Sequence, residues 1–388
     1  MEELLRLVSE AVEGNIYWNK IEAALSSYAL DMSGCPQDPT FHGEGDVWTH
    51  TKMVCEELVK LKSFRVLPNE KAQAVFLAAL LHDIGKIPTT KWEDSRWISP
   101  NHTLVGSKMA RDFLWRDLDL CGTVEKQQFR ETVCNLIRYH GIPPHVVDDA
   151  QGERKLRAIA SNGMLCPTFD VELLCILCEA DARGRVCADP ADKVRMLEQL
   201  QLCRELAIES GCFDAPFPFA SDYTRFSYLD GKDIAPEAEL YDDTWTEVIL
   251  MSGLPGTGKD TWIREHYSDL PMISLDEIRK EMKISPTENQ GKVLEIARER
   301  AKQLLRKRQP FVWNATNLSP MIRGKLISLF HQYHAATRIV YLETPWREQL
   351  RRNAGRVERV PERAISHMMR EMVLPEVKEA VCVEWHCI

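Results

Sequence analysis

A glycine-rich turn in the second half of the chain constrains the fold more than any other feature of the sequence. The segment Gly253-Leu254-Pro255-Gly256-Thr257-Gly258-Lys259 follows the apolar run 247–251 and precedes a helical pattern. Backbone N–H groups in such a turn can face phosphate oxygens, and the lysine that ends it can reach the outer phosphates of a nucleotide. A strand, a glycine loop and a helix in this order belong to a parallel sheet, so an α/β fold is expected here.

The rest of this part of the chain alternates between short apolar runs and longer helical patterns. Apolar runs predict strands at 272–275, 311–315 and 338–342, and apolar residues at helical spacing predict helices at 291–307 and 320–333. Strands that alternate with helices indicate a parallel sheet with helices on both faces.

The first half of the chain has a different pattern, because helical periods follow one another without strand-like alternation. We therefore expect an all-α domain over residues 1–210, a linker over 211–244 and the α/β domain over 245–388. The linker mixes prolines with aromatic residues, which are expected to pack on one of the domains. The helices expected in the first domain are 47–61, 72–84, 104–118, 131–140, 171–183 and 193–209.

The composition favours a reduced, cytoplasmic protein with no membrane partner. The 12 cysteines are scattered, the first residues are acidic, and no apolar run is long enough to span a bilayer. Cys175 and Cys178 form a CxxC pair inside an apolar helix with no second pair, which indicates core packing more than metal or redox chemistry. The formal net charge of −9 is uneven, with a small basic surplus after Trp245 that would suit a polyanion.

Histidines and aspartates recur at the ends of the apolar helices of the first domain. The run 75–81 leads directly into His82-Asp83-Ile84-Gly85-Lys86. Imidazoles and carboxylates are costly to bury without partners, and divalent metal ions would partner them. A single histidine of this kind more often caps a helix or forms a core hydrogen bond, so the metal hypothesis depends on the whole set. The candidate ligands are His50, His82, Asp83, His102, His140 and Asp181.

This order of residues resembles the HD phosphohydrolase superfamily over about residues 30–185, and within it the members whose extra histidines hold two metals. The stretch His42-Gly43-Glu44-Gly45-Asp46-Val47-Trp48-Thr49-His50 resembles the entry to the first ligand helix of such domains. The resemblance implies two divalent transition metals, such as Mn, Fe, Ni, Co or Zn. One would be held by His50, His82, Asp83 and Asp181, and the second by Asp83, His102 and His140.

The same resemblance makes Asp83 a catalytic residue and implies that Lys86 contacts the substrate phosphate. A solvated lysine beyond a helix end is the alternative for Lys86. His42 and His145 have no assigned role.

The glycine-rich loop departs from the usual pattern at one position. Asp260 follows Lys259, where serine or threonine normally meets Mg²⁺, and Thr261 is turned by about 100° around the helix. Either Asp260 holds Mg²⁺, directly or through water, or it stabilises the helix N-terminus while nucleotide and waters hold the ion. The expected cofactors are ATP or another NTP and Mg²⁺. The residues expected to bind them are Gly253, Gly256, Thr257, Gly258, Lys259, Asp260 and Thr261.

The strands after the loop indicate a kinase rather than a motor ATPase. Asp276 follows the strand at 272–275 and would accept the proton of an attacking hydroxyl, while Arg279, one turn later, suits an acceptor phosphate. The alternative is an N-cap aspartate with a surface arginine. Asn314 stands where a motor ATPase would place an aspartate.

The last kinase candidates are two arginines near a basic helix end. Arg352 and Arg356 precede Val360-Pro361, in the manner of a kinase lid that closes on the transferring phosphate. A solvated basic helix face is the alternative reading of these arginines.

The glycine loop, Asp276, Arg279 and the two lid arginines together resemble the phage-type polynucleotide 5′-kinase over most of residues 245–375. The fusion of such a kinase to an HD domain resembles the bacterial HD-Pnk end-healing enzymes. The resemblance implies phosphorylation of 5′-OH ends of RNA or DNA, with Lys259, Asp276, Arg352 and Arg356 catalytic. It also implies removal of 2′,3′-cyclic or terminal 2′ or 3′ phosphates in the HD domain, with a separate ligase as partner.

Two other functions stay open at this stage. One is an HD nucleotidase fused to a nucleoside or other small-molecule kinase, which the modest basic charge permits. The other is a non-catalytic regulator, against which the complete ligand set argues.

Overall fold

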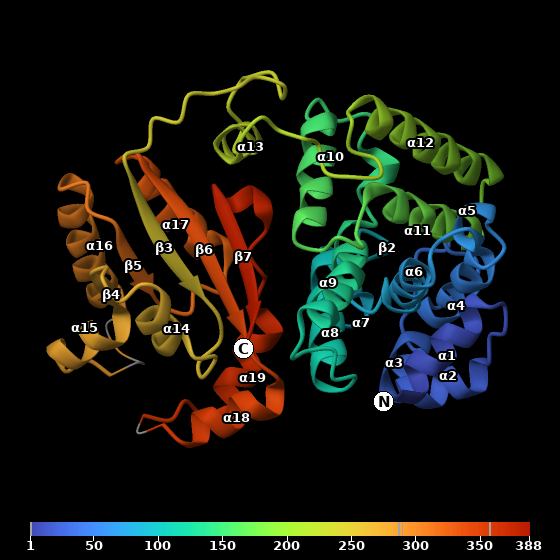
Figure 1. The fold of residues 1–388 in the computed structure, drawn as a ribbon. Helices are drawn as coiled ribbons and strands as arrows, with labels where there is room; N and C mark the ends of the chain where they lie inside the picture. The colour runs from blue at the N-terminus through green and yellow to red at the C-terminus, as the bar shows by residue number, and fades with distance from the viewer. Residues whose placement is uncertain (1, 286–287, 289, 357) are drawn as a thin grey trace. The chain divides into compact units, whose positions relative to one another are not determined.

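The structure is a computed structural model, which describes residues 2–285, 288, 290–356 and 358–388. The chain divides into two compact units (Figure 1). The first comprises Met1–Leu120 and Glu125–Phe217, and the second comprises Cys121–Val124 and Pro218–Ile388.

The first unit is helical, as the periodicity of the sequence predicts. Helices α4, α6 and α11 pack together at its centre, and from Ala74 to Leu81 every residue of α6 is buried. Its helices are α1 (Glu2–Val12), α2 (Trp18–Leu25), α3 (Ser27–Ser33), α4 (Val47–Leu58), α5 (Lys62–Arg65), α6 (Asn69–Leu81), α7 (Lys86–Thr89), α8 (His102–Arg116), α9 (Val124–Tyr139), α10 (Gly152–Ala160), α11 (Val171–Gly184) and α12 (Pro190–Glu209), with the short 3₁₀ helices η1 (Pro143–His145) and η2 (Ser161–Met164).

One feature of this unit differs from the sequence-based expectation of helices alone. Strands β1 (Lys91–Glu93) and β2 (Arg96–Ile98) form an antiparallel hairpin. The turn residues Asp94 and Ser95 both have positive φ, of 50° and 60°, as a tight two-residue hairpin turn requires. Strands of three residues are too short to give a recognisable alternation in the sequence, and this is why the hairpin was missed.

The second unit contains a five-stranded parallel sheet in the order β4-β5-β3-β6-β7, which confirms the α/β fold class. The four strands expected from the sequence are present, and β7 was not anticipated. The strands are β3 (Thr246–Ser252), β4 (Met272–Ser274), β5 (Phe311–Asn314), β6 (Ala335–Glu343) and β7 (Cys382–Cys387). The helices are α13 (Asp222–Leu229), α14 (Lys259–His266), α15 (Leu275–Met282), α16 (Gln290–Arg306), α17 (Pro320–His331), α18 (Trp346–Ala354), α19 (Glu362–Glu371) and η3 (Val377–Glu379).

The sheet alternates its side chains between two apolar layers. Val248 and Leu250 of β3 face a core formed with α16 and α17, and Ile249 and Met251 face a smaller core beside α14. Phe226 of α13, in the segment predicted as a linker, joins the larger core. In the described part of the chain, no helix combines the length and apolarity needed to cross a bilayer.

Candidate functional site

The six candidate metal ligands come from five separate elements of the first unit. His50 lies on α4, His82 and Asp83 directly follow α6, and His102 begins α8. All six side chains are buried or half-buried. The remaining ligands are His140, which follows α9, and Asp181, on α11.

A close approach of two backbones brings α8 onto the His-Asp pair. A Cβ atom on Gly85 would lie 2.0 Å from the carbonyl oxygen of His102 and 2.4 Å from the amide nitrogen of Gly106. Only glycine fits at position 85, and its small size allows the first turn of α8 to lie against the segment that carries Asp83. The glycine two residues after Asp83 therefore has a packing role in building the site.

Asp83 lies between two groups of histidines. Its Oδ1 atom is 3.6 Å from Nε2 of His102 and 3.9 Å from Nε2 of His140. Its Oδ2 atom is 3.1 Å from Nε2 of His82 and 3.9 Å from Nε2 of His50. The donor atoms form two compact sets that share Asp83, which is the arrangement expected of a bridging carboxylate.

Backbone contacts orient three of these imidazoles in the same way. Nδ1 of His82, His102 and His140 donates to the carbonyl oxygen three residues earlier, at 2.8, 2.9 and 2.8 Å respectively. A carbonyl only accepts, so the proton is on Nδ1 and the lone pair is on Nε2, which faces Asp83.

The surroundings of the Nε2 atoms suit a metal ion. Nε2 of His82 is buried, and its 3.1 Å approach to Oδ2 of Asp83 does not have the geometry of a hydrogen bond. Lone pairs that converge on carboxylate oxygens repel unless a cation lies between them, and borderline divalent metals prefer imidazole with carboxylate. The residues present therefore fit a divalent metal centre.

His50 has a different orienting partner, which the sequence reasoning missed. Its Nδ1 atom is 2.7 Å from Oε1 of Glu44, and its Nε2 atom is 3.0 Å from Oδ1 of Asp181. Nδ1 of His42 bonds to the same Glu44 oxygen at 2.9 Å. His42, unassigned from the sequence, therefore belongs to the surroundings of His50. The His42-to-His50 stretch carried the signal, but spacing alone does not reveal which side chains converge.

Two cations border the cluster. Lys86 is buried, and its Nζ atom is 2.8 Å from Oδ2 of Asp83 and 2.7 Å from Oε1 of Gln37. Arg185, which was not predicted, contacts both carboxylate oxygens of Asp181, at 3.1 and 2.7 Å. The burial of Lys86 disfavours the alternative of a solvated lysine.

Burial and neighbouring charges favour the metal-binding protonation state in four of these residues, but not in His82. Burial lowers the pKa of His140 to about 3 and lowers the pKa of His102. Burial alone would raise the pKa of Asp83 and of Asp181, but neighbouring imidazoles, Lys86 and Arg185 hold both well below the usual range. The pKa of His82 is raised overall, because Asp83 and Asp181 outweigh its burial.

In the second unit, the glycine-rich loop joins β3 to α14, as the motif requires. Gly253 has φ of 144°, and a Cβ atom there would lie 2.6 Å from the carbonyl oxygen of Leu342. Among the described residues, the backbone N–H groups of Gly256 and Gly258 have no hydrogen-bond acceptor. Unpaired N–H groups at the start of a helix form a site for phosphate oxygens.

Lys259 is held within the same loop. Its Nζ atom donates to the carbonyl oxygens of Gly253 and Leu254, at 2.9 Å each, and burial lowers its pKa to about 8. The hydroxyl of Thr257 donates to Leu254 O at 2.9 Å, so this side chain stabilises the turn.

Asp260, the departure from the usual loop, has a specific partner. Its Oδ1 atom accepts a hydrogen bond of 2.7 Å from Nδ2 of Asn314, at the end of β5. Thr261 is exposed, and its Oγ1 atom accepts from Arg264 at 3.1 Å. Asp260 therefore faces the carboxyl end of the sheet.

The remaining kinase candidates surround this loop. Asp276 lies in the first turn of α15, directly after β4, and forms an ion pair with Arg279. A guanidinium nitrogen of Arg352 would lie 3.4 Å from a Cβ atom on Gly258, which places it beside the loop. The charges of Asp276 and Arg356 both affect the pKa of Lys259.

Comparison with known proteins agrees with this division. Residues 46–162 match the family described as HD domain, and residues 248–375 match the family described as AAA domain. The chain therefore joins an HD domain to a P-loop domain of the AAA type. This pairing supports a phosphohydrolase combined with a kinase, with divalent metals in one domain and a nucleotide with Mg²⁺ in the other.

Curated relatives match only part of the chain. A multifunctional CCA protein of Stenotrophomonas maltophilia (strain K279a) is 30% identical over 163 residues, which are 42% of this chain and 36% of the relative. A multifunctional CCA protein of Hahella chejuensis (strain KCTC 2396) is 27% identical over 156 residues, which are 40% of this chain and 32% of the relative. The chain thus spans about a third of the length of these relatives.

Proposed function

We propose that this protein repairs nucleic-acid ends by removing a phosphate at one terminus and adding one at the other. The observation that carries the proposal is the presence, in one chain, of two phosphate-handling sites of different kinds. One is the pair of donor sets that share Asp83, and the other is the glycine loop with Lys259. A substrate that needs both reactions has two chemically different ends, as a broken polynucleotide does.

In the HD site the substrate is a 2′,3′-cyclic phosphate or a terminal 2′ or 3′ monophosphate. When bound, two divalent cations would supply a nucleophile from water and neutralise charge on the phosphate. His50, His82, Asp83 and Asp181 would hold one of them, and Asp83, His102 and His140 would hold the other. Lys86, buried against Asp83, binds an oxygen of the reacting phosphate.

In the kinase site the acceptor is a 5′-OH end and the donor is ATP or another NTP. The N–H groups of the loop and Lys259 bind the donor phosphates. Asp276 accepts the proton of the attacking hydroxyl, and Arg279 binds a phosphate of the acceptor strand. Arg352 and Arg356 stabilise charge on the phosphate during transfer.

The proposed substrate of both sites is a polynucleotide. This assignment is supported by the name of the relatives, multifunctional CCA protein, and by the small basic surplus of the residues after Trp245. A separate nucleic-acid ligase would join the healed ends.

The decisive experiment uses an RNA with a 5′-OH and a 2′,3′-cyclic phosphate, incubated with the metal-loaded protein with and without ATP. We expect loss of the 3′-terminal phosphate in both reactions, and a new 5′ phosphate only with ATP. The same assay on 3′-mononucleotides and free nucleosides tests the small-molecule alternative. Equal or better activity on these would overturn the polynucleotide assignment.

A further inference from the structure

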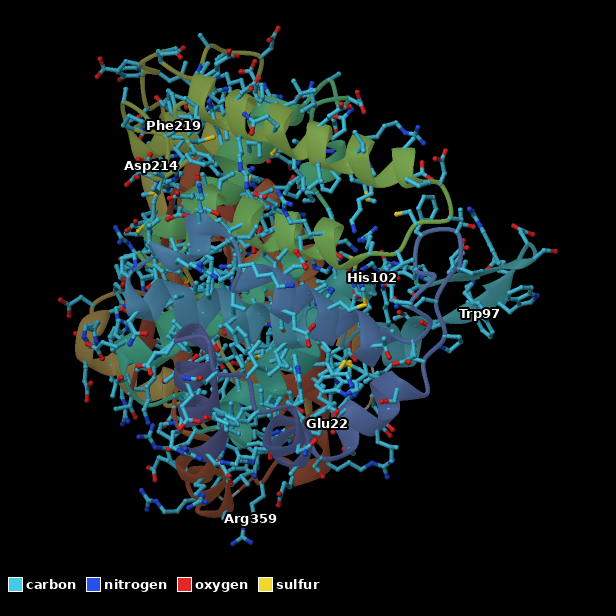
Figure 2. The ribbon with its side chains drawn as sticks, turned by 90° about the vertical axis from the view of Figure 1, so that its right-hand side faces the viewer. Glu22, Trp97, His102, Asp214, Phe219 and Arg359 are labelled. Carbon is cyan, nitrogen blue, oxygen red and sulfur yellow. The ribbon has the colours of Figure 1, made fainter. Side chains whose placement is uncertain are left out.

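The β1–β2 hairpin carries a pair of tryptophans next to the proposed HD site, of which Trp92 is exposed and Trp97 is half-buried. Trp92 and Trp97 are directly opposed in the hairpin, and their rings lie edge to face with centroids 5.1 Å apart. Trp92 is 59% exposed. Figure 2 shows Trp97 on the hairpin where it extends beyond the helices of the first unit. A cross-strand aromatic pair of this kind contributes about 0.2–1 kcal/mol to the hairpin, and aromatic side chains that are accessible beside a candidate site also suit binding.

The hairpin borders a cavity that reaches the metal-ligand candidates. The cavity has a volume of about 210 Å³, and both Trp97 and His102 line it. The strand that leaves the hairpin is tied to the site, because the carbonyl oxygen of Ser99 accepts the hydrogen bond from Nδ1 of His102. The Ser99 hydroxyl also bonds to Thr90 at 2.8 Å, across the base of the hairpin. The position of Trp97 is therefore coupled to that of a proposed ligand.

The charge of the cavity suits an anion, although the first unit is acidic overall. Lys86, Arg96 and Arg185 line it, against the single carboxylate of Asp38. Lys86 and Arg185 are paired with Asp83 and Asp181 at the inner end. Arg96 is exposed at the outer end, and no carboxylate lies within ion-pair distance of it in the part of the chain described.

We propose that the hairpin is the nucleic-acid-binding element of the HD site, with Trp97 stacking on the terminal base and Arg96 binding the phosphodiester that precedes it. The proposal rests on the end-healing function proposed above and names which residues distinguish a polynucleotide end from a simple phosphate ester. An aromatic platform beside a cation is the usual means of holding single-stranded nucleic acid without reading its sequence.

The test compares two monoester substrates of the same HD site. One is a 5′-blocked oligoribonucleotide with a 3′-phosphate, and the other is p-nitrophenyl phosphate, which lacks base and phosphodiester. Trp97→Leu, which keeps an apolar side chain, is expected to lower the ratio of kcat/KM for the oligonucleotide to kcat/KM for p-nitrophenyl phosphate about ten-fold, the effect of losing one stacked base. Trp97→Phe should restore most of that ratio.

Arg96 has a matched control on the same hairpin. Arg96→Gln should lower the ratio of kcat/KM for the oligonucleotide to kcat/KM for p-nitrophenyl phosphate. It should also weaken the salt dependence of kcat/KM for the oligonucleotide, since one phosphate contact is lost. With a 3′-mononucleotide, which has no preceding phosphodiester, the effect of Arg96→Gln should disappear while that of Trp97→Leu remains. Lys91→Gln removes a hairpin cation that pairs with Glu93 and does not line the cavity, so its ratio should equal that of the unmodified protein.

The two proposals fail in different ways. If the unmodified protein cleaves p-nitrophenyl phosphate but no oligonucleotide end, the end-healing function is wrong and the hairpin proposal with it. If it cleaves both and the Trp97 and Arg96 variants keep the ratio of the unmodified protein, only the hairpin proposal is overturned. Binding of the same oligonucleotide, followed by fluorescence anisotropy in EDTA, should weaken in the same variants without any turnover.

Discussion

At the scale of single residues, Asp260 and Asn314 exchange the residue types that are usual at two positions around a nucleotide. P-loop enzymes commonly place serine or threonine after the loop lysine and an aspartate at the end of a neighbouring strand. This chain has the carboxylate after Lys259 and an amide at the end of β5, and the two side chains are joined at 2.7 Å. One carboxylate and one neutral polar group are retained, with their positions reversed.

This exchange predicts how the kinase depends on Mg²⁺. A carboxylate beside nucleotide phosphates is unfavourable unless a cation lies between them. Asp260→Ala should therefore raise the Mg²⁺ concentration for half-maximal kinase activity, and Asp260→Ser should recover part of the loss. Asn314→Ala removes the donor that orients Asp260 and should raise the same midpoint by a smaller factor.

The competing role for Asp260 is stabilisation of the N-terminus of α14, worth about 0.3–1 kcal/mol. Under that role, Asp260→Ala would lower the free energy of unfolding slightly and leave the Mg²⁺ midpoint unchanged. Titration of kinase activity against Mg²⁺, together with denaturant unfolding, separates the two roles.

The residue proposed as general base makes a second prediction at this scale. Removal of a positioned base typically costs about 10²–10⁴-fold in rate, so Asp276→Ala should lower kcat for a 5′-OH oligonucleotide by such a factor. The affinity for ATP, measured by equilibrium binding, should change little. Weak ATP binding with normal turnover at saturation would make Asp276 a nucleotide-site residue instead.

At the scale of elements, helix termini help to determine where the proposed metal ligands lie. Helix α4, which carries His50, begins at the N-cap Asp46, whose carboxylate accepts from the backbone N–H of Thr49 at 2.9 Å and from its hydroxyl at 2.8 Å. Helix α11, which carries Asp181, begins in the same way at Asp170. The two caps fix the first turns of α4 and α11, and these helices carry His50 and Asp181, whose side chains meet in the core of the unit.

The cap of α4 is open to a direct test. Asp46→Ala removes the acceptor for the Thr49 N–H, and loss of an N-cap costs about 0.5–2 kcal/mol. The free energy of unfolding of the first unit should fall by that amount. Its denaturant midpoint, followed by circular dichroism, should fall accordingly. Asp46→Asn, which keeps an acceptor oxygen, should behave almost as the unmodified protein. Equal destabilisation by both variants would show that the charge, not the cap, is what matters.

At the scale of the whole molecule, the two candidate sites lie in different units and use different residues. The proposed reactions should therefore be separable. Asp83→Ala should abolish release of the 3′-terminal phosphate and leave 5′ phosphorylation largely intact, because Asp83 belongs to both donor sets of the first unit. Lys259→Ala should do the reverse.

Both activities would be assayed on one doubly labelled RNA, so that each variant is its own control. Loss of both reactions in Asp83→Ala, with an unchanged circular dichroism spectrum, would contradict a model of two independent sites.

The sequence alone determined the features in which neighbouring residues carry the signal. The helical and alternating patterns predicted the two fold classes, and the apolar runs predicted four of the five strands of the parallel sheet. The run that ends in His82-Asp83 and the loop that ends in Lys259 were recognisable because each motif is continuous in the chain. The grouping of Asp83 with His50, His82, His102 and His140 was expected only from the resemblance to HD phosphohydrolases, because no local pattern links these distant residues.

Only the tertiary structure decided which distant side chains meet. The contacts of Glu44 with His50, of Arg185 with Asp181, and of Asn314 with Asp260 depend on helix packing and strand order. Strands β1, β2 and β7 were missed, because short or edge strands have weak local patterns and are defined by their pairing partner. The cavity beside Trp97 exists only once that hairpin is formed, since no periodicity in the sequence encodes where a short turn places its side chains.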